Sequence, residues 1–183
     1  MTVRIEKSGS VWTLIHSRPH TRNAMDPASA DALVAAFQSF DDDPAADVAV
    51  LWGEGGAFCA GWDMKYVSSL EGDRPLASLD FPTDGSKLPR GPLGPTRLEL
   101  SKPVIAAVEG PAVAGGMELA LWCDLRVMAE SAYIGVYNRR WGYPSHRRWD
   151  RAPAAPGRSG ARARHHPDRP QGHCRRMLPH RCL

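Results

Sequence analysis

The stretch that most constrains this fold is residues 102–124, which read KPVIAAVEGPAVAGGMELALWCD. Val104–Val108 is a short, continuous apolar run with β-branched residues at both ends, which is typical of a strand covered on both faces. Gly110-Pro111 ends this run, and Ala114-Gly115-Gly116 leads into Met117–Cys123, whose residues favour a helix. The stretch therefore predicts a buried strand, a glycine turn and a helix.

The turn and the first residues of this helix carry groups that suit chemistry at a carbonyl. Amides at a helix start have no intrahelical acceptor and lie at the positive end of the dipole, and glycines let a ligand oxygen approach them. Glu118 stands one turn into the helix. Two interpretations of Glu118 stay open: it complements the helix dipole, or it is a catalytic carboxylate beside amides that stabilise developing negative charge.

The rest of the N-terminal part predicts alternating strands and helices, hence an α/β architecture. Residues 71–95, rich in Gly, Pro, Asp and Ser, predict a mobile surface loop. The expected strands are Val3–Glu6, Val11–His16, Val48–Trp52, Leu125–Met128 and Tyr133–Val136, and the expected helical segments are Pro27 to about Phe40 with Asp26 as its cap, a helix near Met64, and a turn at Arg97–Ser101.

Composition separates the chain into two parts. Residues 145–183 contain ten arginines against two aspartates, a net charge of +8, so residues 1–144 carry −5 of the total of +3. No apolar run approaches the roughly 20 residues of a membrane span, and the N-terminus does not resemble a secretory signal. The four cysteines form no CxxC pair or disulfide framework, which predicts a reducing cytoplasm; they are Cys59, Cys123, Cys174 and Cys182.

Three segments of residues 1–144 resemble the signatures of the crotonase (enoyl-CoA hydratase/isomerase) family. They are RPHTRNAMD, GAFCAGWDMK and KPVIAAVEGPAVAGGMELALWCDLRVMAE. The resemblance implies the crotonase-like (ββα) spiral fold, an acyl-CoA thioester as substrate, and neither a metal nor a further cofactor. It also implies a homotrimer or a dimer of trimers where the family's C-terminal helices are intact.

The resemblance assigns roles to residues of two turns. The amides of Trp62 and Gly115 match the family's oxyanion hole, which polarises the thioester carbonyl. For Arg22, an exposed cation without a role in binding is an equally open interpretation. The positions that match the family's substrate-binding segments are Arg22, Ala24, Ala60, Gly61, Asp63, Met64 and Gly116.

The resemblance also places the proton-transferring groups. Family hydratases hold a water between two glutamates, and Glu118 matches the first of these. Counting back from Gly142 places Asn138 at the second. An amide can hold a water but cannot take or give its proton at neutral pH, so Asn138 weakens the case for hydration by two acids.

The resemblance stops after Pro144, and residues 145–183 predict a disordered Arg-, Pro- and His-rich tail. A shift of reading frame near codon 145 accounts for the whole tail, because reading one base later permits the family's continuation. The family's C-terminal helical region would then be missing or replaced. Two other interpretations are an arginine-rich arm that binds nucleic acid and a metal site built from the tail's histidines and cysteines; no ligand spacing supports the latter.

Three functions follow from these patterns. The first is a crotonase-type acyl-CoA enzyme that resembles enoyl-CoA hydratases and stabilises a thioester enolate. The second is a catalytically impaired remnant or thioester-binding pseudoenzyme, which Asn138 and the altered C-terminal part favour. The third is nucleic-acid binding through the tail, which carries the basic excess of the chain.

Overall fold

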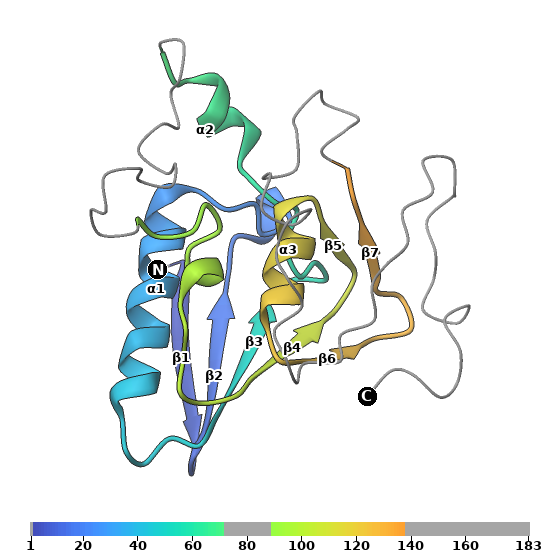
Figure 1. Cartoon of the computed structure of the whole chain (residues 1–183). Coiled ribbons are helices and arrows are strands. Elements are labelled where there is room, and N and C mark those ends of the chain that lie inside the picture. The colour runs from blue at the N-terminus through green and yellow to red at the C-terminus, as the bar shows by residue number, and fades with distance from the viewer. Residues whose placement is uncertain (1, 72–88, 138–183) are drawn as a thin grey trace, which may run out of the picture.

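The computed structural model describes residues 2–71 and 89–137 (Figure 1). These residues form an α/β arrangement, as the sequence predicts. In chain order the elements are β1 (Val3–Ser8), β2 (Val11–His16), the 3-10 turn η1 (Pro19–Thr21), α1 (Pro27–Asp42), β3 (Val48–Gly53), α2 (Met64–Ser68), the 3-10 turn η3 (Pro95–Arg97), β4 (Val104–Val108), β5 (Pro111–Val113), α3 (Gly115–Trp122), β6 (Leu125–Met128) and β7 (Tyr133–Gly135).

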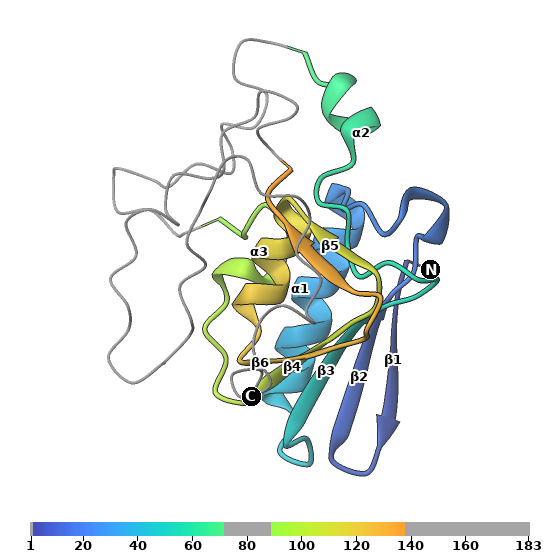
Figure 2. The same cartoon turned by 90° about the vertical axis from the view of Figure 1, so that its right-hand side faces the viewer.

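Two sheets organise these elements. The larger has the strand order β1-β2-β3-β4-β6, with β1 antiparallel to β2 and all other pairs parallel. The smaller pairs β5 with β7 in parallel. In both Figure 1 and Figure 2, β5 and β7 lie beside α3, away from the β1–β2 hairpin. Parallel pairing places the carboxyl ends of β2, β3 and β4 at one edge of the large sheet.

Helix α1 begins as its sequence predicts. The Asp26 side chain accepts a hydrogen bond from the Ser29 amide at 2.8 Å, and Pro27 occupies the first helical position. The helix continues through Asp42, two residues beyond the predicted end at Phe40. The aspartates there favour a helix start over a helix end, yet Asp41 side-chain bonds to Ser101 tie this last turn to the segment before β4.

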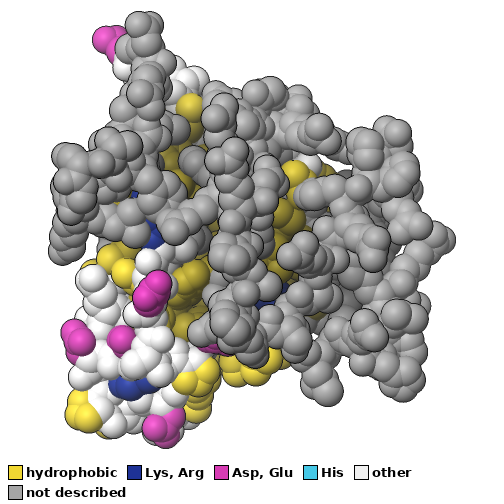
Figure 3. Space-filling view, in the orientation of Figure 1, with side chains coloured by type: hydrophobic (Ala, Val, Ile, Leu, Met, Phe, Trp, Pro, Cys, Tyr) yellow, Lys and Arg dark blue, Asp and Glu magenta, His cyan; other side chains and the backbone are white. Residues whose placement is uncertain are grey.

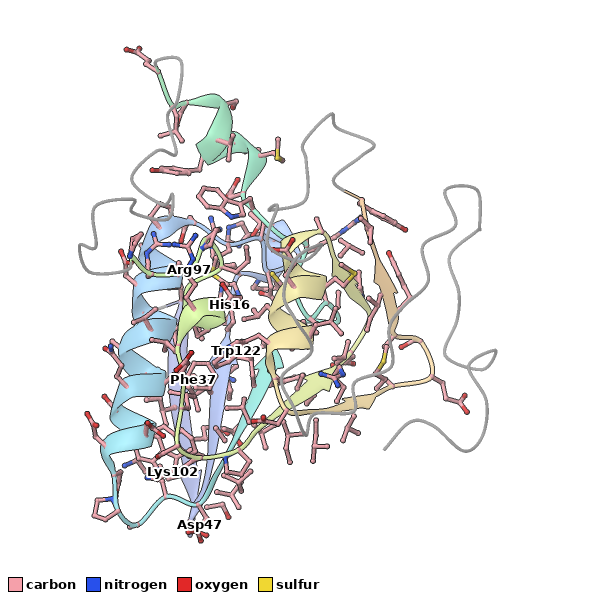
Figure 4. All side chains as sticks on the ribbon, viewed as in Figure 1. His16, Phe37, Asp47, Arg97, Lys102 and Trp122 are labelled. Atoms are coloured by element: carbon pink, nitrogen blue, oxygen red, sulfur yellow. The ribbon has the colours of Figure 1, made fainter. Side chains whose placement is uncertain are left out.

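The core lies between the large sheet and the two helices on one of its faces. Phe37 of α1 meets Trp122 of α3 edge to face, with ring centroids 5.0 Å apart (Figure 4). Beneath them the register places Leu14, Leu51 and Ala106 in one row across β2, β3 and β4, and each is at most 1% exposed. Figure 3 shows the molecule from the same side as Figure 1. Scattered acidic side chains lie on the part of this surface that the structure describes.

The opposite face of the large sheet differs from the prediction. Val104–Val108 was expected to be covered on both faces, but its side chains alternate between buried and half-buried. Leu125 and Val127, which align with Ile105 and Ala107, are 51% and 67% exposed. A continuous apolar run does not reveal whether a strand is covered on both faces or on one face, because the sequence is apolar in both cases.

Three local predictions also need correction. The helical turn lies at Pro95–Arg97 rather than at Arg97–Ser101, because Pro95 supplies the fixed φ of a helix start. Strand β5 was not predicted, since three residues after a Gly-Pro carry too little pattern. Leu93 is fully buried, so the end of the predicted surface loop 71–95 packs into the core, whereas residues 72–88 lie outside the described part.

His16 predicts acid sensitivity. It ends β2, is 2% exposed, and neither ring nitrogen has a hydrogen-bond partner within the described residues (Figure 4). Burial first, and then the nearby Arg18 charge, lower the pKa of His16 from 6.5 to about 4. The unfolded chain therefore binds the proton more tightly, and stability falls as pH decreases from about 6.5 to about 4.

We expect this loss to reach about 3 kcal/mol, and expect His16→Leu to remove it while leaving stability at pH 7 equal or higher. Urea unfolding of both proteins at several pH values measures the effect. An unchanged pH dependence in His16→Leu would assign the acid sensitivity to other groups.

Candidate active site

Several helix starts and loops gather at the carboxyl edge of the large sheet. In Figure 1 the first residues of α1 and of α3 lie at the end to which β2 and β3 point, and α2 extends from the same end. Ligand sites of parallel α/β sheets form at this edge, because loops and helix N-termini converge there. The predicted site residues of the described part belong to these loops.

The first turn holds Trp62 through its neighbours. Met25 donates to the Gly61 carbonyl at 2.7 Å and accepts from the Asp63 amide at 2.9 Å. In such parallel pairing the residue between the two bonded neighbours directs its own amide to the other side. Accordingly, the Trp62 amide donates to no acceptor among residues 2–71 and 89–137.

The second turn holds Gly115 in the same way. Val113 donates to the Cys59 carbonyl at 3.0 Å, and Ala114 donates to Gly135 at 2.9 Å. Ala114 has φ 52° and ψ −124°, a conformation that is costly for an alanine and that orients the following peptide. Gly115 is the first residue of α3, so its amide lacks an intrahelical acceptor, and it has no other acceptor in the described part.

The two turns are in contact. A Cβ placed on Gly61 would lie 3.1 Å from the Gly115 amide nitrogen and 3.0 Å from the Ala114 Cβ. Gly61 has φ +89°, which a residue with a side chain rarely adopts. The contact brings together the two segments whose amides the sequence analysis pairs as an oxyanion hole. The pairing of the Trp62 and Gly115 amides on one ligand oxygen stays a prediction.

The two glycines at the start of α3 are required by packing within the protein, rather than by the approach of a ligand oxygen as expected. A Cβ on Gly115 would lie 2.5 Å from Cδ2 of Leu93, and a Cβ on Gly116 would lie 2.0 Å from the Cys59 carbonyl oxygen. Both missing side chains therefore make room for the protein's own atoms. The glycines allow the helix to pack closely against the first turn, which in turn fixes where the free amide points.

Glu118 lies on the first turn of α3 and is 8% exposed. Burial raises the pKa of its carboxyl from 4.5 to about 7. Its carboxylate has no hydrogen-bond partner in the described part of the chain. The carboxylate oxygens are not fully buried there and keep some contact with solvent. A carboxyl with a pKa near neutrality can both take and give a proton, which suits a general acid–base group.

The predicted substrate-binding residues occupy different environments. Arg22 is exposed and left-handed, with φ 53°, and its carbonyl accepts from Ala60 at 3.1 Å. Met64 is 43% exposed, whereas Ala24 is buried. Asp63 is also buried and is occupied by protein contacts, an ion pair with an arginine and the N-cap of α2. Asn138 lies outside the described residues, and its role stays a prediction.

Asn23 is a site-supporting residue that the sequence analysis did not single out. It is fully buried, accepts from the Arg18 amide at 2.7 Å, and donates to the carbonyls of Glu54 and Ala57 at 2.8 and 2.7 Å. One side chain thus satisfies backbone groups of both loops. The available signal was a lone Asn in the RPHTRNAMD segment, where its positive φ of 54° is readily tolerated.

Two expected absences concern the described residues alone. Residues 2–71 and 89–137 contain no group of three or more His, Cys, Asp or Glu side chains arranged for a metal ion. No helix among them has the length and apolar character needed to cross a bilayer. Cys59 and Cys123 are buried free thiols, and burial raises the pKa of each to about 12, so neither is a reactive nucleophile.

The chain is similar in sequence to characterised acyl-CoA proteins. It is 37% identical over 148 residues to an enoyl-CoA hydratase of Mycobacterium tuberculosis, covering 76% of this chain and 51% of the relative. It is 39% identical over 143 residues to a carnitinyl-CoA dehydratase of Proteus mirabilis, covering 77% and 51%. The chain thus spans about half the length of the curated relatives it matches.

Solved structures show the same relationship and confirm the crotonase-like fold. An enoyl-CoA hydratase of Mycobacterium tuberculosis aligns with a TM-score of 0.65 at 34% identity, covering 79% of this chain and 52% of that one. A probable enoyl-CoA hydratase/isomerase of Mycobacterium abscessus aligns with a TM-score of 0.64 at 37% identity, with the same coverage.

The family model described as enoyl-CoA hydratase/isomerase matches residues 6–162. This match continues past residue 144, where the resemblance was expected to stop. The boundary between a domain of residues 1–144 and a tail of residues 145–183 stays a prediction, because residues 138–183 lie outside the described part. With most of its length matched, the chain belongs to the enoyl-CoA hydratase/isomerase family.

Proposed function

We propose that this chain adds water to the double bond of a 2-enoyl-CoA thioester, as a lyase. One observation carries the proposal: two turns in contact leave the amides of Trp62 and Gly115 without an acceptor in the described part, and Glu118, with a pKa of about 7, lies one turn away. Fixed donors next to a proton-transferring carboxyl are what an enolate intermediate requires.

In the proposed reaction the thioester oxygen binds between the two amides. Glu118 takes a proton from water as the water oxygen bonds to C3 of the substrate. The electron pair of the double bond moves towards the thioester oxygen, giving an enolate that the amides stabilise. The same carboxyl then returns the proton to C2, so that one water is added and Glu118 ends as it began. The only reactants are the CoA thioester and one water.

The dehydratase among the relatives agrees with this chemistry, since removal of water from an acyl-CoA is the reverse reaction. We further propose a cytoplasmic location, from the free cysteines, and, where the family's C-terminal helices are intact, a homotrimer or a dimer of trimers.

The test is hydration of a short 2-enoyl-CoA, followed by loss of the conjugated thioester's ultraviolet absorbance. We expect saturable turnover, with free CoA as a competitive inhibitor. Binding of the CoA thioester without turnover would replace the enzyme by a thioester-binding pseudoenzyme. The absence of both binding and turnover would refute the proposed function.

A gain of function is expected from Asn138→Glu. If residue 138 faces the catalytic water as the family resemblance implies, a second carboxyl adds general acid–base catalysis that an amide cannot supply. General acid–base groups typically contribute about 10²–10⁴-fold, so we expect at least a tenfold increase in kcat. Asn138→Gln is the matched control. Equal activity of the Glu and Gln variants would separate residue 138 from proton transfer.

A further inference from the structure

A single guanidinium joins three loops at the carboxyl edge of the sheet. Arg18 follows β2, and its Nη2 lies 2.9 Å from Oδ2 of Asp63 and 3.2 Å from Oδ2 of Asp26. Its Nη1 donates to the Ala24 carbonyl. The Arg18 side chain is 13% exposed, and its two carboxylate partners are 11% and 24% exposed.

Both partner carboxylates are helix caps. Asp26 accepts from the Ser29 amide at the start of α1, and Asp63 accepts from the Lys65 and Tyr66 amides at the start of α2. Arg18 therefore fixes the start of α1 and the start of α2 relative to the end of β2. Asp63 directly follows Trp62, so the same ion pair fixes the residue on the carboxyl side of the one that carries the free amide.

The charges favour a held, ionised cluster. Burial raises the pKa of each aspartate and is the largest single effect. The hydrogen bonds that each carboxylate accepts, together with the Arg18 charge, outweigh it, so the pKa of both lies below the usual value. If the Arg18 cation is removed, two neighbouring, partly buried carboxylates lose its positive charge, which is unfavourable. The guanidinium has several N–H donors spread over a plane, so it can reach both carboxylates and a carbonyl at once. A lysine ammonium has its donors on a single nitrogen and cannot replace all three contacts.

We propose that Arg18 is a positioning residue, which holds the Trp62 amide in the orientation that the thioester oxygen requires. The proposal rests on the proposed function. The Asp63 amide bonds to Met25, and the Asp63 carboxylate bonds to Arg18, so backbone and side chain together fix the peptide on one side of Trp62. The other side is fixed where the Gly61 carbonyl accepts from Met25.

The kinetic test compares Arg18→Met and Arg18→Lys with Arg4→Met. Arg4 makes a bidentate ion pair with Glu54 at 2.8 Å, so Arg4→Met removes a similar pair from the outer strand without touching the Trp62 turn. We expect Arg18→Met to lower kcat about 100-fold with KM within threefold, since displacement by about 1 Å can have this effect. The kcat of Arg18→Lys is expected to lie between those of Arg18→Met and the unsubstituted chain. The kcat of Arg4→Met is expected to stay within threefold of that of the unsubstituted chain.

A second measurement is independent of turnover. Amide hydrogen exchange, followed by mass spectrometry, reports the mobility of each segment. We expect Arg18→Met to speed exchange selectively in peptides spanning residues 24–30 and 60–68, where the two partner carboxylates cap α1 and α2. In Arg4→Met these peptides are expected to exchange as in the unsubstituted chain. Thermal unfolding of all variants identifies any global loss of structure, which would speed exchange throughout.

The outcomes separate the two proposals. Faster exchange confined to residues 24–30 and 60–68 in a chain that never turns over would support the role of Arg18 in holding the Trp62 turn and would refute the proposed function. Normal turnover by the unsubstituted chain with an unchanged kcat in Arg18→Met would overturn the positioning role alone. It would also be overturned if Arg4→Met and Arg18→Met lowered kcat equally, because loss of any ion pair would then suffice.

Discussion

Replacing Glu118 by Gln is expected to lower kcat about 10²–10⁴-fold, with little change in the affinity for CoA thioesters. Glutamine keeps the size and polarity of the side chain but cannot exchange a proton at neutral pH. Steady-state hydration of a 2-enoyl-CoA measures the effect. Glu109→Gln is the matched control, because Glu109 lies in the same stretch of chain but is exposed. Unchanged turnover in Glu118→Gln would remove Glu118 from the mechanism.

The same substitution has a predicted pH signature. Because Glu118 acts first as a base, kcat/KM should rise with pH through an apparent pKa of about 7 and level off above it. The raised pKa makes stability change with pH in the opposite direction to kcat/KM. Because the folded chain binds this proton more tightly than the unfolded chain, stability falls as pH rises from about 4.5 to about 7. Glu118→Gln should recover on the order of 3 kcal/mol at pH 8. Such a gain together with lost activity would show that the buried carboxyl serves function rather than folding.

Replacing Gly61 by Ala is expected to lower kcat at least about 100-fold, because the two turns can no longer meet. The new Cβ would lie 3.0 Å from the Ala114 Cβ, 3.1 Å from the Gly115 nitrogen and 3.2 Å from the Val113 carbonyl oxygen. Either turn must move to relieve this, and the Trp62 amide lies on one of them.

Gly56→Ala is the control for this prediction. Gly56 has φ +80°, close to the +89° of Gly61, but a Cβ there would meet nothing within 4 Å. It therefore measures the backbone strain alone, about 1–2 kcal/mol. We expect Gly56→Ala to lose stability with kcat nearly unchanged. Similar kinetic losses in both variants would show that strain in the loop, and not the contact between the turns, explains the effect.

Long, strongly patterned elements of this fold could be predicted from the sequence. The Asp26-Pro27 start defines α1, and the β-branched runs of β2 and β3 define their strands, because cap chemistry and apolar pattern are local properties. Strand β5 could not be predicted, since its three residues are extended only because they pair with β7 and with Cys59. That pairing joins segments more than 20 residues apart, which no local pattern encodes.

The site was only partly predictable for the same reason. Glu118 and the glycine turn before it carry local signals of a helix start, and family motifs identify Trp62 and Gly115. The ion pair of Arg18 with Asp63 links residues 45 positions apart, and an arginine before a proline has no distinguishing pattern. Leu93 was assigned to a surface loop from the composition around it, yet it lies fully buried against Gly115.

A structure of the chain bound to a CoA thioester would show directly whether the amides of Trp62 and Gly115 form an oxyanion hole. We expect the thioester oxygen to accept hydrogen bonds from the amides of both Trp62 and Gly115, at about 2.7–3.1 Å, with the Glu118 carboxyl facing the reacting carbons. A thioester oxygen bound away from either amide, or a reacting carbon out of reach of Glu118, would contradict it.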